Sequence, residues 1–290
     1  MFATLLGSLP RRPLADDAAP EALLDAVLEL QVEHGLEPLT DAGWGLDRED
    51  PVASWRATAA RTDGLVKAVV GGPFTGGRGA AEVRATLVGL AEAGCRWIEV
   101  HEPGATGIGG DADDRARFMD VHATLTAGFG DDVHLSLAIT GGSADGAGID
   151  TLLVGAYASL ALDLINGPDN WRLATKWPAE RGLICGALST REGSDDGPEL
   201  LLWAARYGAS TRGRGPARVG LATAGSLAGL AWAVAAEKVR RLGEAARLAA
   251  APLDESLAAI DPRAVDKRSA ALGRYEPNAE PRKVRKGPAP

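Results

Sequence analysis

The sequence predicts an α/β protein: a single-domain (β/α)8 barrel, the TIM-barrel fold, with a C-terminal extension. Short apolar runs alternate with amphipathic stretches of helical periodicity, and eight such runs fall within about the first 250 of the 290 residues. The rival architecture is a doubly wound open sheet, which is typically marked by a glycine-rich phosphate loop after its first strand. Here the first run leads into Gly7-Ser8-Leu9-Pro10-Arg11, which lacks that pattern. A barrel is therefore favoured.

Each expected element follows from its local pattern. Helical spacing of apolar residues is clearest between Leu23 and Gln31, and Asp or Ser residues stand near several helix starts. The expected strands are Phe2–Leu6, Glu37–Thr40, Leu65–Val70, Trp97–Val100, Val133–Ala138, Ser159–Ile165, Leu183–Ala187 and Ala217–Ala222. The expected helices between them include Pro20–His34, Ala80–Ala93, Asp114–Ala127, Gly197–Tyr207 and Ser226–Ala250.

Composition excludes several classes of protein. The net charge of −8 argues against a nucleic-acid surface, so we expect a small-molecule substrate instead. Two cysteines cannot form a disulfide framework. No apolar run approaches the roughly 18–20 residues that span a bilayer, and Met1–Leu9 lacks the features of a secretory leader. A cytoplasmic protein is expected, and its oligomeric state is left open.

The composition changes near Ala251, where prolines begin to alternate with charged residues. Basic residues concentrate between Lys267 and Lys286. We therefore expect residues 1–250 to form the barrel and residues 251–290 to form a C-terminal helical extension and a flexible basic tail.

Four motifs in chain order carry a family resemblance. They are Leu5–Arg11, Gly35–Asp41, Lys67–Thr75 and Ile98–Pro103. The first is similar to Gly-Ser-Phe-Pro-Arg, the third ends in Gly-Pro-x-Thr, and the fourth resembles Gln-x-Asp-Glu-Pro. Together they resemble the C-terminal catalytic barrel of cobalamin-independent methionine synthase. That family belongs to a superfamily that also contains uroporphyrinogen decarboxylase-like barrels.

The resemblance implies a reaction and a cofactor. In that family a zinc ion activates the thiol of homocysteine, which receives a methyl group from a methylated folate. The family's four zinc-ligand positions fall here on His134, Ser136, Asp163 and Gly225. Only His134 and Asp163 keep a plausible donor, whereas zinc needs three or four. We therefore do not expect a tight zinc site, and methylated folate remains the methyl donor that the resemblance implies.

The resemblance also implies a pocket for the amino-acid end of a substrate. The family uses backbone groups at the positions of Gly7 and Ser8, and Arg191 matches a family arginine. Trp44 is a candidate wall of this pocket, although ordinary packing explains it equally well. The expected substrate-binding residues are Gly7, Ser8, Asp41, Ser136 and Arg191.

The candidate catalytic residues are His101, Glu102, His134 and Asp163, expected at the carboxyl ends of the strands, where barrels carry their reaction sites. An imidazole next to a carboxylate is suited to proton transfer, but neighbours on a strand face opposite ways, so only His101 or Glu102 faces inward. Each residue also has a structural alternative. Glu102 would cap a loop or bind an arginine while His101 lies at the surface, and His134 would be a hydrogen-bonded core residue. Asp163 would meet a cation or bind a ligand, because burying it unpaired is costly.

Three functions stay open on these grounds. The leading hypothesis is a methionine-synthase-like methyltransferase with a degenerate zinc site, acting on a thiol such as homocysteine or on a related acceptor. The second is a metal-free barrel enzyme of the lyase or decarboxylase type, and the third is a barrel without catalytic activity.

Overall fold

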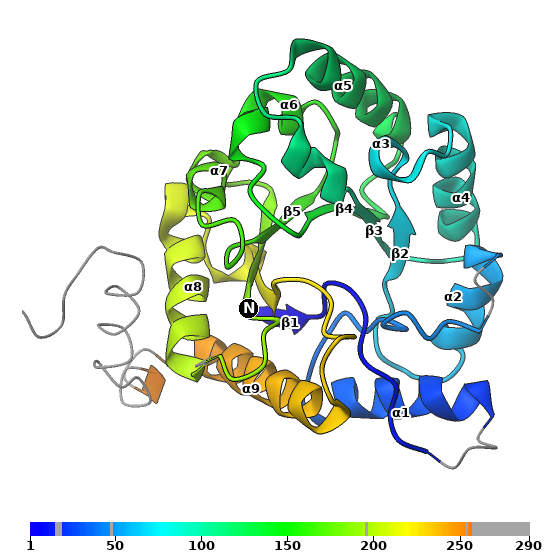
Figure 1. Ribbon diagram of the computed structural model, residues 1–290, viewed down its shortest axis with the longest axis vertical. Coiled ribbons are helices and arrows are strands. Elements are labelled where there is room, and N and C mark those ends of the chain that lie inside the picture. Colours follow the sequence, from blue (N-terminus) through cyan, green and yellow to red (C-terminus); the bar gives the residue numbers. More distant parts are fainter. Residues whose placement is uncertain (15–18, 47–48, 195–196, 253–254, 257–290) are drawn as a thin grey trace, which may run out of the picture.

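The computed structural model describes residues 1–14, 19–46, 49–194, 197–252 and 255–256. Nearly all of the expected C-terminal extension, including its basic tail, lies outside these residues. Seven parallel strands form one curled sheet in the order β1-β7-β6-β5-β4-β3-β2, with helices around its outside (Figure 1). The strands are β1 (Phe2–Thr4), β2 (Ala68–Gly71), β3 (Trp97–His101), β4 (His134–Ile139), β5 (Ser159–Asp163), β6 (Gly182–Leu188) and β7 (Val219–Thr223). The α/β fold is thus confirmed.

The α-helices lie in the connections between these strands, as parallel pairing requires, and α9 follows the last strand. They are α1 (Pro20–Glu33), α2 (Pro51–Ala59), α3 (Pro73–Gly76), α4 (Ala80–Glu92), α5 (Ala112–Thr126), α6 (Ile149–Leu153), α7 (Asn170–Lys176), α8 (Pro198–Ser210) and α9 (Trp232–Ala250). Short 3-10 turns lie at Pro103–Gly107, Asp145–Ala147, Thr211–Gly213 and Pro216–Arg218. No helix in the part of the chain that the structure describes is long and apolar enough to cross a bilayer.

The last helix begins later than expected, at Trp232 rather than Ser226. The intervening turn is tied to the end of β1, because Leu227 donates its backbone N–H to Ser8 O at 2.8 Å. The Ser226 hydroxyl lies 3.3 Å from the same oxygen. These bonds tie residues 226–227 to the segment after the neighbouring strand β1, and the helix therefore begins further along the chain.

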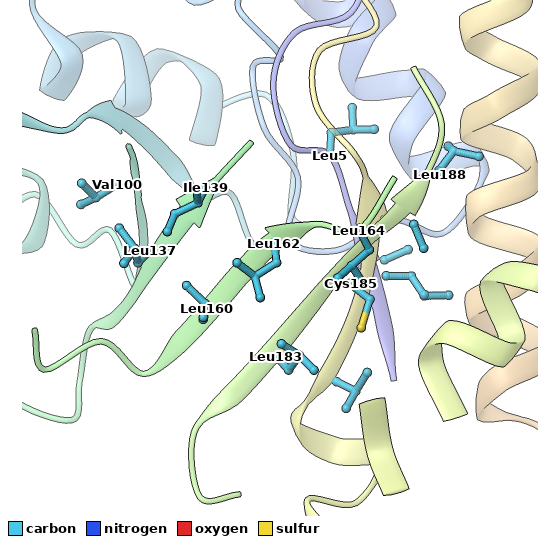
Figure 2. Packing of buried hydrophobic residues seen from close by; sticks show 14 of the residues in the cluster. Leu5, Val100, Leu137, Ile139, Leu160, Leu162, Leu164, Leu183, Cys185 and Leu188 are labelled. Atoms are coloured by element: carbon cyan, nitrogen blue, oxygen red, sulfur yellow. The ribbon is translucent and has the colours of Figure 1, made fainter. Parts of the chain in front are cut away.

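Two packed layers result from the alternation of side chains along the strands. Outward-facing apolar residues such as Val100, Leu137 and Leu160 pack under the helices in one large cluster (Figure 2). Burial of each such leucine stabilises the fold by about 1.5–3 kcal/mol. Inward-facing residues form a separate, smaller cluster containing Ala138 and Ala161. These short side chains leave room inside the curled sheet for polar residues.

The expected strand Glu37–Thr40 forms no regular strand. It makes a single parallel bridge, Leu39 to Val66, and its backbone bonds to both neighbours. Glu37 N–H donates to Ala3 O at 2.8 Å, and Leu39 N–H donates to Leu65 O at 2.7 Å. Pro38 has no N–H to contribute, which shortens the ladder. The described residues therefore contain seven regular strands, and this segment joins the two edge strands.

Candidate functional site

A cavity of about 560 Å³ opens at the carboxyl ends of β1 and β3 and the start of β2, beside the segment after Leu39 and the helix α2. Four of the nine site residues expected from sequence line it: Gly7, Ser8, Asp41 and His101. A volume of this size suits a small molecule. The structure thus brings three of the five expected substrate-binding residues together with one expected catalytic residue.

The end of β1 is held in a backbone conformation that favours glycine. Gly7 has a φ of +92°, and a Cβ there would lie 2.7 Å from Ser226 N. The neighbouring backbone is fixed by Thr223, whose hydroxyl lies 2.9 Å from Leu6 N, and by Leu9 N–H, which donates to Ala42 O at 3.0 Å. These bonds set the position of Ser8 at the cavity wall.

Two indoles, those of Trp44 and Trp55, also line the cavity. Trp44 donates its Nε1–H to Leu9 O at 3.0 Å, and Trp55 donates its own to Val66 O at 3.1 Å. Because both N–H groups are bound to backbone, the rings offer apolar surface to the cavity. Val69 on β2 also lines the cavity, and it is 40% exposed. Asp41 Oδ1 accepts the Gly43 N–H at 3.0 Å, which orders the turn at the rim.

Beneath His101 lies a buried charge network that was not predicted from sequence. Lys67 Nζ lies 2.9 and 2.8 Å from the two carboxylate oxygens of Glu99 and also donates to Leu5 O at 2.8 Å. Glu99 Oε1 lies 2.7 Å from His101 Nε2. The side chains of Lys67 and Glu99 are fully buried, whereas His101 is 17% exposed.

The network sets the charge of its members. Burial alone would raise the pKa of Glu99, but Lys67 and the His101 contact outweigh it and lower the pKa to about 2. Burial lowers the pKa of Lys67, and the Glu99 carboxylate opposes this effect. A usable sequence signal exists: Glu99 and His101 are two residues apart on one strand and therefore face the same side.

Glu102 faces the other way, behind the sheet. Its carboxylate accepts the N–H groups of Phe74 and Thr75 at 3.0 and 2.8 Å, and the Thr75 hydroxyl at 2.7 Å. His122 Nε2 lies 3.2 Å away, and its Nδ1 lies 2.6 Å from the Tyr157 hydroxyl. Burial raises the pKa of Glu102, but the nearby His122 and the hydrogen bonds from Thr75 and Phe74 outweigh it and lower the pKa. This is the loop-capping arrangement, outside the cavity lining.

Asp163 ends β5 and is fully buried, but neither a cation nor a ligand is needed to stabilise it. Its oxygens accept backbone N–H groups from Gly141, Ile165 and Asn166 at 2.8–3.1 Å, and the Asn166 side-chain amide at 2.9 Å. Arg191 Nη2 donates to Asn166 Oδ1 at 3.2 Å. Asp163 and Arg191 therefore organise the loops at the ends of β5 and β6, and neither lines the cavity.

His134 lies at the wrong end of the sheet for the expected site. It is the first residue of β4 and pairs in register with Trp97, whereas His101 is the last residue of β3. Its ring centroid is 3.8 Å from that of Trp97, and Nε2 lies 2.8 Å from Ser159 Oγ. Burial lowers the pKa of His134 to about 4. The expectation that His134 shares a cavity mouth with the acidic residues is wrong.

Ser136 lies between these two ends of the sheet. It is fully buried inside the sheet, where its hydroxyl accepts a hydrogen bond from Ser159 at 2.9 Å. It does not line the cavity.

The four positions that the family uses for zinc do not fit the metal here. His134 lies at the amino end, Asp163 is occupied by loop amides, and Gly225 offers no side-chain donor. Among the residues described, no group of three His, Cys, Asp or Glu side chains could hold a metal ion. Cys185 is no substitute, because burial raises its pKa to about 12.

No family model matches the chain, and no curated protein matches it. Solved structures are similar to it. A B12-independent methionine synthase from Shewanella sp. W3-18-1, in complex with selenomethionine, has a TM-score of 0.70 at 12% identity, covering 89% of this chain and 99% of its own. A putative vitamin-B12-independent methionine synthase from Listeria monocytogenes has a TM-score of 0.62 at 13% identity, covering 85% and 97%.

A putative dihydrodipicolinate synthetase from Pseudomonas aeruginosa is also similar, with a TM-score of 0.53 at 13% identity over 94% of this chain and 82% of its own. At these identities the likeness establishes the fold. The protein has an α/β fold similar to TIM barrels, including those of methionine synthases, and its chemistry must be argued from its own residues.

Proposed function

We propose that the protein is a methionine-synthase-like barrel enzyme that acts on a small molecule bound in the 560 Å³ cavity, with His101 as its proton-transferring group. One observation carries the proposal: Gly7, Ser8 and Asp41, expected to bind the amino-acid end of a substrate, line the same cavity as His101. We further infer that Glu37–Thr40 takes the eighth strand position of one domain spanning residues 1–250. Its backbone bonds to Ala3, Leu65 and Lys67 support this inference.

The leading reaction is methyl transfer to a thiol such as homocysteine or to a related acceptor, with a methylated folate as donor. A free thiol has a pKa of about 8.5 and is a weak nucleophile until it loses its proton. In this proposal the S–H proton passes to His101 as the new sulfur–carbon bond forms. The bond between the methyl group and the folate nitrogen breaks, and that nitrogen keeps the electron pair and then takes a proton. General-base catalysis of this kind contributes about 10²–10⁴-fold.

The second candidate is metal-free lyase or decarboxylase chemistry at the same cavity. The contact of His101 with a buried carboxylate favours it, because this pair can move a proton without any metal. The candidates differ in what the cavity must hold. Methyl transfer needs a donor and an acceptor together, whereas a lyase needs one substrate.

The test is a turnover assay with purified protein, L-homocysteine and methylated folate, run with and without a metal chelator and accompanied by metal analysis. We expect methionine to form at a rate that the chelator does not change. The substitution His101→Gln should slow it by about 10²-fold or more, because the base is lost. His34→Gln, a histidine at the end of α1 outside this cavity, is the matched control and should leave the rate unchanged.

Stoichiometric zinc together with chelator-sensitive turnover would contradict the metal-free site. Unchanged turnover in His101→Gln would remove His101 from the mechanism. Absence of methionine would reject methyl transfer to homocysteine and leave the lyase candidate. That candidate predicts a pH–rate profile that changes in His101→Gln.

A further inference from the structure

We propose that Glu99 is a positioning residue that fixes the tautomer of His101, with Nε2 protonated and Nδ1 presented to the cavity as an acceptor. We also propose that Lys67 is the group that holds Glu99 in this role. The inference rests on the proposed function only for its catalytic consequence. The tautomer itself is tested without turnover.

The argument begins with Lys67, whose ammonium group can only donate hydrogen bonds. It lies within 2.9 Å of both Glu99 oxygens and 2.8 Å from Leu5 O, so both carboxylate oxygens act as acceptors. Without this ammonium group, burial would favour the protonated, uncharged acid. Lys67 therefore keeps Glu99 ionised, and the lowered pKa of Glu99 agrees with this.

An ionised carboxylate carries no proton, so it can only accept. The 2.7 Å contact between Glu99 Oε1 and His101 Nε2 must therefore be donated by Nε2–H. A neutral imidazole carries one N–H, which leaves the lone pair on Nδ1. The geometry of three side chains thus selects one tautomer.

The chemical consequence concerns Nδ1, the ring nitrogen that does not contact Glu99. Nδ1 of His101 has no hydrogen-bond partner among the residues described, and it is not one of the buried unpaired nitrogens. His101 lines the cavity, so a bound molecule meets an acceptor there. The matching ligand group is a donor, such as a thiol, a hydroxyl or an ammonium.

The substitution Glu99→Gln tests this directly. Lys67 can only donate, so it will hold the glutamine oxygen and turn the amide NH₂ toward His101. His101 Nε2 must then accept, which moves the ring proton to Nδ1. We expect two-bond ¹H–¹⁵N NMR spectra, at a pH where the ring is neutral, to show Nε2–H in the unmodified protein and Nδ1–H in Glu99→Gln. His101→Gln assigns the signals.

His122 is an internal control, because it contacts a different glutamate, Glu102, and its tautomer should be the same in both proteins. A second variant, Lys67→Met combined with Glu99→Gln, frees the glutamine amide to rotate. The tautomer reversal should then be lost at least in part.

The unmodified protein alone decides the first claim: an Nδ1–H tautomer there overturns the proposal even if Glu99→Gln does not fold. An Nε2–H tautomer that persists in a folded Glu99→Gln overturns the role of Glu99. Full reversal without Lys67 overturns the role of Lys67. An Nε2–H tautomer in a protein with no turnover would leave this inference standing while the proposed function fails.

Discussion

Lys67 and Glu99 are the least expected side chains inside the curled sheet, because charged groups are rarely fully buried. Removing two charges from water costs several kcal/mol per ion, and a well-packed apolar pair would fill the same space. The pair is placed directly under His101, which lines the cavity. We infer from this position that the pair serves the chemistry of His101 rather than the stability of the fold.

The stability of this pair gives a first prediction. Lys67→Met should lower the free energy of unfolding by about 3–5 kcal/mol, because it leaves the Glu99 charge buried without its cation. The double variant Lys67→Met with Glu99→Gln removes both charges and should recover most of the loss. Urea unfolding at pH 7 measures both. A double variant as unstable as the single variant would contradict the pairing.

His134 gives a prediction about acid stability. Its folded-state pKa of about 4 lies below the unfolded value near 6.5, so the unfolded chain binds more protons between these values. The resulting stabilisation is present above pH 6.5 and is lost as the pH falls from about 6.5 to about 4. His134→Gln should remove this loss, which amounts to at most about 1 kcal/mol per pH unit.

The measurement is urea unfolding of both proteins at pH 7, 6 and 5. As the pH falls, the free energy of unfolding of the unmodified protein should decrease relative to that of His134→Gln. A gap that is independent of pH would show that His134 does not titrate in this range.

At the level of elements, sequence predicts which side of a strand faces inward but not which end a residue occupies. The period of two puts His134 and Ser136 on one side of β4, and both side chains contact Ser159 there. The error concerned the end of the strand: His134 was expected at the cavity from the family resemblance, although the expected strand Val133–Ala138, like the observed β4, has His134 near its amino end. Glu37–Thr40 was predicted as a strand from its apolar residues, but Pro38 limits its ladder.

Several short helices were also not predicted from the sequence. The helices α2, α3, α6 and α7 were not predicted, because they have nine, four, five and seven residues and too few turns to show a period. A cap could have revealed α2, since Asp50 accepts the N–H groups of Val52 and Ala53. This omission matters, because α2 forms one wall of the cavity.

The end of β1 gives a prediction at this scale. Gly7→Ala should lower the free energy of unfolding by about 2–4 kcal/mol, through left-handed strain and overlap with Ser226 together. Gly35→Ala is the matched control: its φ is +68°, but a Cβ there meets nothing within 4 Å. It should lose only about 1–2 kcal/mol. Equal losses in thermal or urea unfolding would mean that the close approach at Gly7 does not constrain the cavity wall.

For the whole molecule, the cavity lies where regular strand pairing is interrupted. Gly7 comes from the segment after β1, Lys67 from the approach to β2, and Thr40 from the segment Glu37–Thr40 between the two strands. The sequence led to part of this site, because the motif residues Gly7, Ser8, Asp41 and His101 follow strand ends. Lys67 and Glu99 were missed, since the packing of two strands, rather than any local motif, brings them together.

The central claim is that this cavity is where the ligand binds, and calorimetric titration of L-homocysteine into the metal-free protein tests it most directly. Val69→Trp fills the cavity with an indole, whereas Val32→Trp places the same side chain on a valine of α1 that is 56% exposed. We predict saturable binding to the unmodified protein and to Val32→Trp, and none to Val69→Trp. Equal binding to a folded Val69→Trp, or no binding to the unmodified protein, would contradict the account.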